Sequence, residues 1–178
     1  MSRIKWVEEE DAEGKVKAVY GQLKSVFGGV PGVIKVLSPW PELLELYATR
    51  IGMIMFSETR LSRAVKEMIA SLVSRINECG YCLTYHKGFL VETGISSAEA
   101  EAIVADYKTA SITDAEKKLL AYVEKVTRNA YKVTDSDVEG LKECGWSEEQ
   151  ILEATLVVGL FSDINRWVDA LGVRIEND

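Results

Sequence analysis

Apolar residues recur along most of the chain with the three- and four-residue spacing of an amphipathic helix. The clearest stripe comprises Leu61, Val65, Met68, Ile69, Leu72, Val73 and Ile76. No segment shows the sustained alternation of apolar and polar residues that is typical of a half-buried strand. The pattern therefore predicts an all-α fold.

Capping signals divide this pattern into separate helices. Three pairs match the Ser/Thr-x-x-Glu/Gln box that satisfies open N–H groups in a first helical turn, namely Ser96 with Glu99, Thr113 with Glu116, and Ser147 with Gln150. Helices are expected over residues 11–27, 39–56, 61–78, 80–94, 97–107, 114–131, 135–144 and 147–171.

Proline and glycine mark the remaining boundaries. Ser38-Pro39 is expected to open a helix, because proline is tolerated in the first turn, and Gly145 is expected to close one. The glycine-rich segment 28–32 is the clearest break and is expected to lead into a short helical turn. No Gly/Ser-rich or Pro-rich linker divides the chain, so residues 1–178 are expected to form one compact domain.

Two distant segments share a further pattern. Residues 62–79 and 148–165 each contain an apolar helix with a glutamate, Glu67 or Glu153, twelve residues before a polar end. An internal helical duplication would explain this similarity, and so would the general likeness of amphipathic helices.

Charge and composition narrow the class of protein. The 178 residues are 47% hydrophobic, which is ordinary for a globular domain, and the net charge of -7 argues against nucleic acid as a partner. The first residues lack the apolar core of a secretory signal, and the most apolar stretch, 154–161, is too short to span a bilayer. A cytoplasmic protein without a membrane role is expected.

The three cysteines include one close pair, Cys79 and Cys82, followed by the only histidine, His86. If this segment is helical, all three side chains share one face, and Cys82 and His86 are one turn apart. The imidazole could then take the thiol proton, while Cys79 could close a disulfide with Cys82. A helix N-terminus at the pair would further stabilise a thiolate. The spacing favours a reactive thiol site.

Other readings of the same residues remain open. The histidine and the cysteines could be buried packing residues. A structural zinc site would need a fourth ligand such as Glu67 or Cys144. Haem attachment of the c type is excluded, because the position after Cys82 is Leu83, and the chain lacks the strands of a thioredoxin domain. The pattern alone treats Glu67 as an ordinary exposed glutamate, and Tyr81 as either a hydrogen-bond donor or a packing residue.

The segment Asn77 to His86, preceded by Glu67, resembles the AhpD-like alkylhydroperoxidases of the carboxymuconolactone decarboxylase superfamily. The shared motif is a glutamate, eleven residues, Cys-x-x-Cys, three residues and a histidine, and residues 61–95 form its core. The resemblance extends to the peroxidase-related branch through 31–41 and 160–166. It implies an AhpD-like all-helical fold and assembly into homo-trimers or hexamers.

The resemblance also implies roles for the motif residues. Cys82 would be the peroxidatic thiolate, Cys79 the resolving thiol and His86 the base, with Glu67 orienting His86, directly or through water. Tyr81 departs from the best-characterised members, which have histidine there, so a phenol would replace one member of the proton relay.

The leading hypothesis is therefore a thiol peroxidase that reduces a hydroperoxide through a dithiol/disulfide cycle and is restored by an external dithiol reductant, with no metal or other cofactor. The alternative is a non-catalytic redox-sensing or metal-binding module that uses the same cysteines and histidine. Catalytic turnover of peroxide distinguishes the two.

Overall fold

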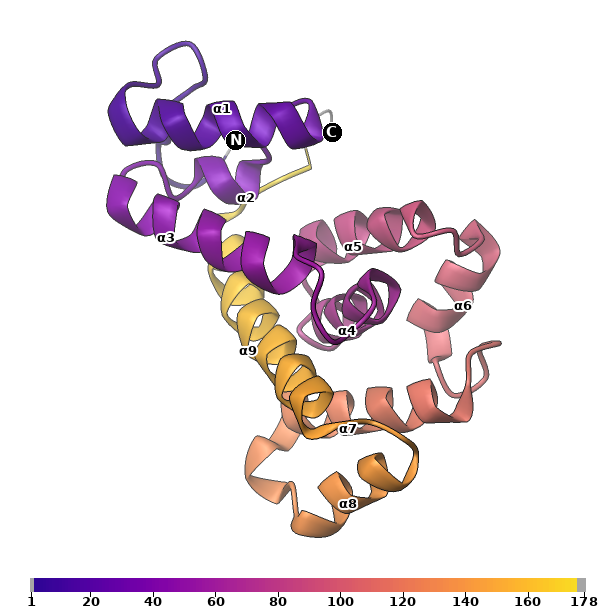
Figure 1. The fold of residues 1–178 in the computed structure, drawn as a ribbon. Helices are drawn as coiled ribbons and strands as arrows, with labels where there is room; N and C mark the ends of the chain where they lie inside the picture. The colour runs from indigo at the N-terminus through magenta and orange to yellow at the C-terminus, as the bar shows by residue number, and fades with distance from the viewer. Residues whose placement is uncertain (1, 176–178) are drawn as a thin grey trace. The chain divides into compact units, whose positions relative to one another are not determined.

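The computed structural model describes residues 2–175 and is all-helical over that range, with no strand, as the pattern predicts (Figure 1). Its helices are α1 (Gly14–Phe27), α2 (Gly32–Lys35), α3 (Pro41–Ile51), α4 (Arg63–Ile76), α5 (Gly80–Glu92), α6 (Ser97–Asp106), α7 (Asp114–Asn129), α8 (Asp135–Glu143) and α9 (Glu148–Leu171). A π-helical segment, Gly52–Phe56, follows α3, and a 3-10 turn, Ala130–Lys132, follows α7. None of the helices in residues 2–175 is long and apolar enough to cross a membrane.

The described chain forms two compact units, one from residues 2–53 and 167–175 and the other from residues 54–166. The first unit packs α1, α2 and α3 around a small apolar core that includes Tyr20, Ile34 and Leu44. The Tyr20 hydroxyl donates to the Val7 carbonyl at 2.9 Å, which fixes the N-terminal segment on this core. A single domain over residues 1–178 stays a prediction.

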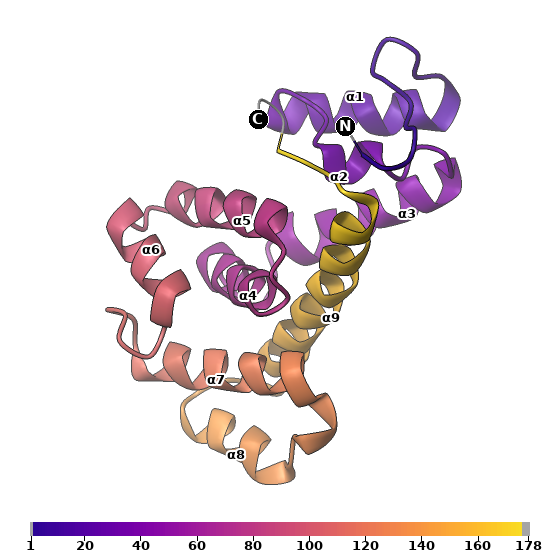
Figure 2. The same cartoon turned by 180° about the vertical axis from the view of Figure 1, so that it is seen from behind.

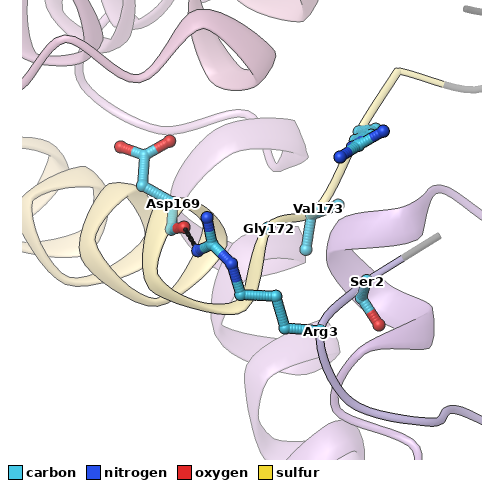
Figure 3. Close-up of a pocket in the computed structure, with 6 residues that line it drawn as sticks. Ser2, Arg3, Asp169, Gly172 and Val173 are labelled. Carbon is cyan, nitrogen blue, oxygen red and sulfur yellow. Dashed lines mark hydrogen bonds between the residues drawn. The ribbon is translucent and has the colours of Figure 1, made fainter.

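Arg3 closes the C-terminal end of α9 within the first unit. Its guanidinium donates to the carbonyls of Asp169 and Ala170 at 2.6 and 2.8 Å, beside a cavity of about 380 Å³ that Gly172 and Val173 also line (Figure 3). These carbonyls belong to the last turn, where a helix has no partners of its own. The guanidinium therefore serves as a helix cap.

The predicted caps explain where several helices begin and end. Thr113 and Glu116 form a reciprocal capping box at α7, and the hydrogen bonds between Ser147 and Gln150 are likewise reciprocal. Gly145 has the left-handed φ of 92° that follows a helix end. The break at 28–32 leads into the short helix α2, as expected.

The helix expected over residues 39–56 begins later than expected, and its last turn is π-helical and ends at Phe56. Trp40 precedes Pro41, and its φ of -127° and ψ of 85° lie outside the helical region. The ring of a following proline disfavours the helical conformation, so α3 begins at Pro41 and not at Ser38-Pro39. The Ser38 hydroxyl instead accepts a hydrogen bond from the Val7 N–H at 2.7 Å. At the other end, the α-helix stops at Ile51 and continues as the π-helical segment.

The second unit is built around α4, which contacts α5, α6 and α7 and appears nearly end-on among them (Figure 2). Every residue of α4 from Val65 to Ser74 is buried. The apolar stripe predicted from the sequence therefore does not separate a core face from a solvent face, because the opposite face is also covered.

The internal duplication suggested by the likeness between residues 62–79 and 148–165 stays a hypothesis.

The junction between α4 and α5 is a tight, fully hydrogen-bonded turn. The Cys79 N–H donates to the Ser74 carbonyl at 2.9 Å, and the Glu78 N–H donates to the Arg75 carbonyl at 3.1 Å. This is the pattern of a Schellman motif, in which the residue after the C-cap adopts a left-handed conformation. Glu78 has a φ of 61° and is the only non-glycine residue with positive φ within residues 2–175.

We expect Glu78→Gly to stabilise the protein by about 0.5–1 kcal/mol. The left-handed conformation costs a residue with a Cβ roughly 1–2 kcal/mol, and glycine removes that cost. Glycine in turn loses about 0.5–1 kcal/mol more conformational entropy on folding, which offsets part of the gain. Glu92→Gly, at an exposed position in the last turn of α5, is the matched control and should destabilise by up to about 1 kcal/mol. Urea unfolding measures both variants, and equal destabilisation by both would show that Glu78 is not strained.

Candidate active site at the start of α5

The two cysteines lie at the N-terminal end of α5. Cys79 is the N-cap residue and is fully buried, and its carbonyl accepts the Leu83 N–H at 3.0 Å. Cys82 follows in the first turn and is 4% exposed. Neither is in a disulfide in this structure. Both sulfurs therefore sit where the positive end of the helix dipole favours a thiolate.

His86 lies one turn after Cys82 and is held by Glu67 from α4. The distance between His86 Nδ1 and Glu67 Oε2 is 2.7 Å. Because a carboxylate accepts this hydrogen bond, Nδ1 carries a hydrogen, and in a neutral ring the lone pair is then on Nε2. The arrangement leaves Nε2 as the ring nitrogen that can accept a proton.

Glu67 is completely buried, which corrects its reading as an ordinary exposed glutamate. Its contact with His86 is direct, so no water is needed between them. The pattern failed here because Glu67 shares its helix face with Ala70, Ser71 and Ser74, and small and polar residues suggested a solvent face. All four are 0% exposed. Such small residues let neighbouring helices approach α4 closely.

Sequence reasoning missed Arg63, which binds the second oxygen of the Glu67 carboxylate. Arg63 Nε lies 2.7 Å from Glu67 Oε1. The four-residue spacing of Arg63 and Glu67 was an available signal, because side chains one turn apart on a helix can meet. This spacing did not single out Arg63, because Glu67 was expected to be exposed, and exposed ion pairs contribute little to stability.

Aromatic rings enclose the imidazole. Phe161 of α9 meets it edge to face with ring centroids 4.2 Å apart, and Phe89 lies at 6.2 Å. Tyr81 is 7% exposed and packs on Tyr85, with centroids 4.8 Å apart. The packing role considered for Tyr81 is thus present, and its role as a proton donor stays a prediction. No sequence signal paired Phe161 with His86, because they are far apart in the chain.

A second ion pair, between the buried Lys66 and the partly exposed Glu153, fixes the segment that leads into α4. Lys66 is 1% exposed, and its Nζ lies 3.0 Å from the Ser57 carbonyl and 3.1 Å from Glu153 Oε1. Glu153 Oε2 accepts the N–H groups of Arg60 and Leu61, each at 3.0 Å. These bonds hold the backbone immediately before Arg63.

The residues considered for zinc are not grouped as a metal site in residues 2–175. Cys144 is exposed at the C-terminal end of α8. Within residues 2–175, no group of three or more His, Cys, Asp or Glu side chains is arranged to hold a metal ion.

Comparison with known proteins places this site in a family context. The sequence model of the carboxymuconolactone decarboxylase family matches residues 41–125, which include the whole motif. No curated protein matches the chain in sequence.

Several solved structures share the fold. A peroxidase-related protein with an alkylhydroperoxidase AhpD core, from Ralstonia eutropha JMP134, is similar with a TM-score of 0.92 and 23% identity, over 99% of this chain and 93% of that one. A peroxidase-related protein from Silicibacter sp. TM1040 has a TM-score of 0.87 and 25% identity, over 98% and 89% of the two chains. The debrominase Bmp8, in complex with 2,3,4-tribromopyrrole, has a TM-score of 0.84 and 19% identity, over 98% and 91%.

The family match and the shared fold agree with the motif. Together they confirm the resemblance drawn from Glu67, the cysteine pair and His86. Residues 41–125 thus match the carboxymuconolactone decarboxylase family, and the chain shares its fold with AhpD-like proteins.

Proposed function

We propose that the protein is a thiol peroxidase that reduces hydroperoxides through a disulfide between Cys82 and Cys79. The observation that carries the proposal is the hydrogen bond of 2.7 Å between His86 and the buried Glu67, one turn from a cysteine pair at a helix N-terminus. A packing histidine does not need a buried carboxylate, whose desolvation is costly. The peroxidase-related names of two proteins with this fold agree with the proposal.

The cycle begins when His86 Nε2 takes the Cys82 proton. The thiolate attacks the terminal hydroxyl oxygen of the hydroperoxide, which stays on the sulfur as the O–O bond breaks, and the alkoxide leaves as an alcohol with the proton from His86. Cys82 is then a sulfenic acid. The Cys79 thiol attacks its sulfur, water leaves, and a disulfide forms. An external dithiol reduces this disulfide and is itself oxidised, which restores both thiols.

The partners belong to the same proposal. The hydroperoxide and the external dithiol are the reactants, and a homo-oligomer is the expected assembly. The debrominase shares only the fold at its level of identity, so its reaction is not transferred to this chain.

One experiment separates turnover from the sensing and metal-binding alternatives. Thiols are counted under anaerobic conditions before and after one equivalent of hydrogen peroxide or cumene hydroperoxide, with metal analysis of the same sample. A peroxidase loses two thiols rapidly and continues to consume peroxide when dithiothreitol is added. Oxidation without continued consumption would indicate a sensor, and stoichiometric zinc would indicate a metal-binding module.

The two cysteines are predicted to have different roles. Cys82→Ser should abolish peroxide consumption, because the attacking thiolate is gone. Cys79→Ser should react once and then stall as a sulfenic acid or a mixed disulfide, because no resolving thiol is present. Mass spectrometry after one equivalent of peroxide detects the trapped species. If Cys82→Ser still reacts and Cys79→Ser does not, the assignment is reversed.

His86→Gln should slow the reaction near neutral pH by about 100-fold or more, the typical contribution of a general base. Glutamine keeps a hydrogen-bonding group of similar size but cannot accept a proton. Raising the pH should recover much of the rate, because hydroxide then generates the thiolate. Stopped-flow oxidation of reduced protein across a pH series measures this. An unchanged profile would show that the helix terminus alone activates Cys82.

A further inference from the structure

Arg63, Glu67 and His86 form a continuous chain of hydrogen bonds. The Glu67 carboxylate accepts from Arg63 Nε on one oxygen and from His86 Nδ1 on the other, each at 2.7 Å. The carboxylate is 0% exposed, whereas the Arg63 side chain is 31% exposed. The guanidinium thus faces the buried carboxylate from the solvent side.

The guanidinium is held in place by more than this bond. Its central carbon lies 3.9 Å from the ring centroid of Phe56 and 5.5 Å from that of Phe89. Phe89 also contacts the His86 ring at 6.2 Å. The backbone before Arg63 is fixed by Glu153, and Ser62 caps the first turn of α4. These contacts indicate a fixed position and not a mobile surface arginine.

The charge of Arg63 determines which group compensates the Glu67 carboxylate. A buried carboxylate requires a compensating cation, and arginine supplies one that cannot lose its proton. Without Arg63, His86 would be the remaining partner of the Glu67 carboxylate within residues 2–175, and it could compensate the charge by holding protons on both nitrogens. The rings packed on the imidazole, Phe89 of α5 and Phe161 of α9, are uncharged, and Cys82, one turn before His86 in α5, is a thiol.

We propose that Arg63 is a positioning residue that compensates Glu67 and so keeps His86 neutral, with its hydrogen on Nδ1 and its lone pair on Nε2. Arg63 acts through Glu67 and does not touch the reacting sulfur. Its effect on peroxide reduction rests on the proposed function, whereas its effect on the protonation of His86 does not.

Nuclear magnetic resonance of the imidazole nitrogens tests this proposal directly, because His86 is the only histidine in the chain. The full-length protein is labelled with ¹⁵N-histidine and carries Cys82→Ser, so that no thiol competes for the ring. This parent should show one protonated nitrogen, Nδ1, and one unprotonated nitrogen, Nε2, at neutral pH. With Arg63→Gln added, both nitrogens should become protonated.

Two further variants separate charge from structure. Arg63→Lys keeps the positive charge and should restore the neutral ring, whereas Arg75→Gln removes an exposed arginine from the same helix and should change nothing. An Arg63→Gln spectrum identical to that of the parent overturns the proposal. So does an equal change in Arg75→Gln.

A stability cycle keeps the proposal testable if Arg63→Gln folds poorly. The single variant leaves a buried carboxylate uncompensated, so adding Glu67→Gln should raise its melting temperature. A double variant no more stable than Arg63→Gln would show that the two side chains are not coupled.

The peroxide reaction provides a separate readout with Cys82 intact. Arg63→Gln should slow it about 10-fold to 100-fold at neutral pH, the range seen when partners that orient metal-bound histidines are removed. If the wild-type protein does not reduce peroxides at all, the proposed function fails, while the nuclear magnetic resonance result still decides the role of Arg63. A protonation change in Arg63→Gln without any loss of rate in an active enzyme would overturn the catalytic consequence.

Discussion

The Glu67 carboxylate is the group on which the rest of the site depends. It lies in the middle of a helix that is buried on all sides, where an uncompensated negative charge would destabilise the fold. One oxygen is satisfied by Arg63 and the other by His86. Compensation of this buried charge stabilises α4, and the same hydrogen bond from His86 orients the imidazole. This links the stability of the helical unit to the chemistry proposed for it.

The cysteine pair depends on a second constraint, the short junction between α4 and α5. Cys79 ends the Schellman turn of α4 and is also the N-cap of α5. Because its backbone is bonded into both helices, the position of the pair relative to Glu67 is set by main-chain geometry. The unusual left-handed Glu78 is the conformational cost of making this turn so short.

The local part of this architecture could be predicted from the sequence. Helical spacing, the capping boxes at Thr113 and Ser147, and Gly145 located most helices, because each signal acts within one or two turns. The start of α3 was misplaced because Ser38-Pro39 resembled a helix start, whereas Pro41 determined it. The burial of Glu67 and the contact of Phe161 with His86 could not be predicted from spacing, since they depend on how other helices cover α4. The resemblance to the family motif implied that Glu67 orients His86, whereas periodicity alone treated Glu67 as exposed.

Glu153, which anchors the backbone before Arg63, has a lowered pKa. Burial raises the pKa of Glu153, but hydrogen bonds from the Thr59 hydroxyl, Lys66 Nζ and the Leu61 N–H outweigh that effect and leave the pKa below its ordinary value. The stabilisation from this carboxylate is complete above the ordinary glutamate pKa and is lost only as the pH falls through the lowered one. The hydrogen bonds that hold the backbone before Arg63 thus persist to a lower pH than an ordinary glutamate would allow. Mild acidification would therefore leave the start of α4 anchored to Glu153.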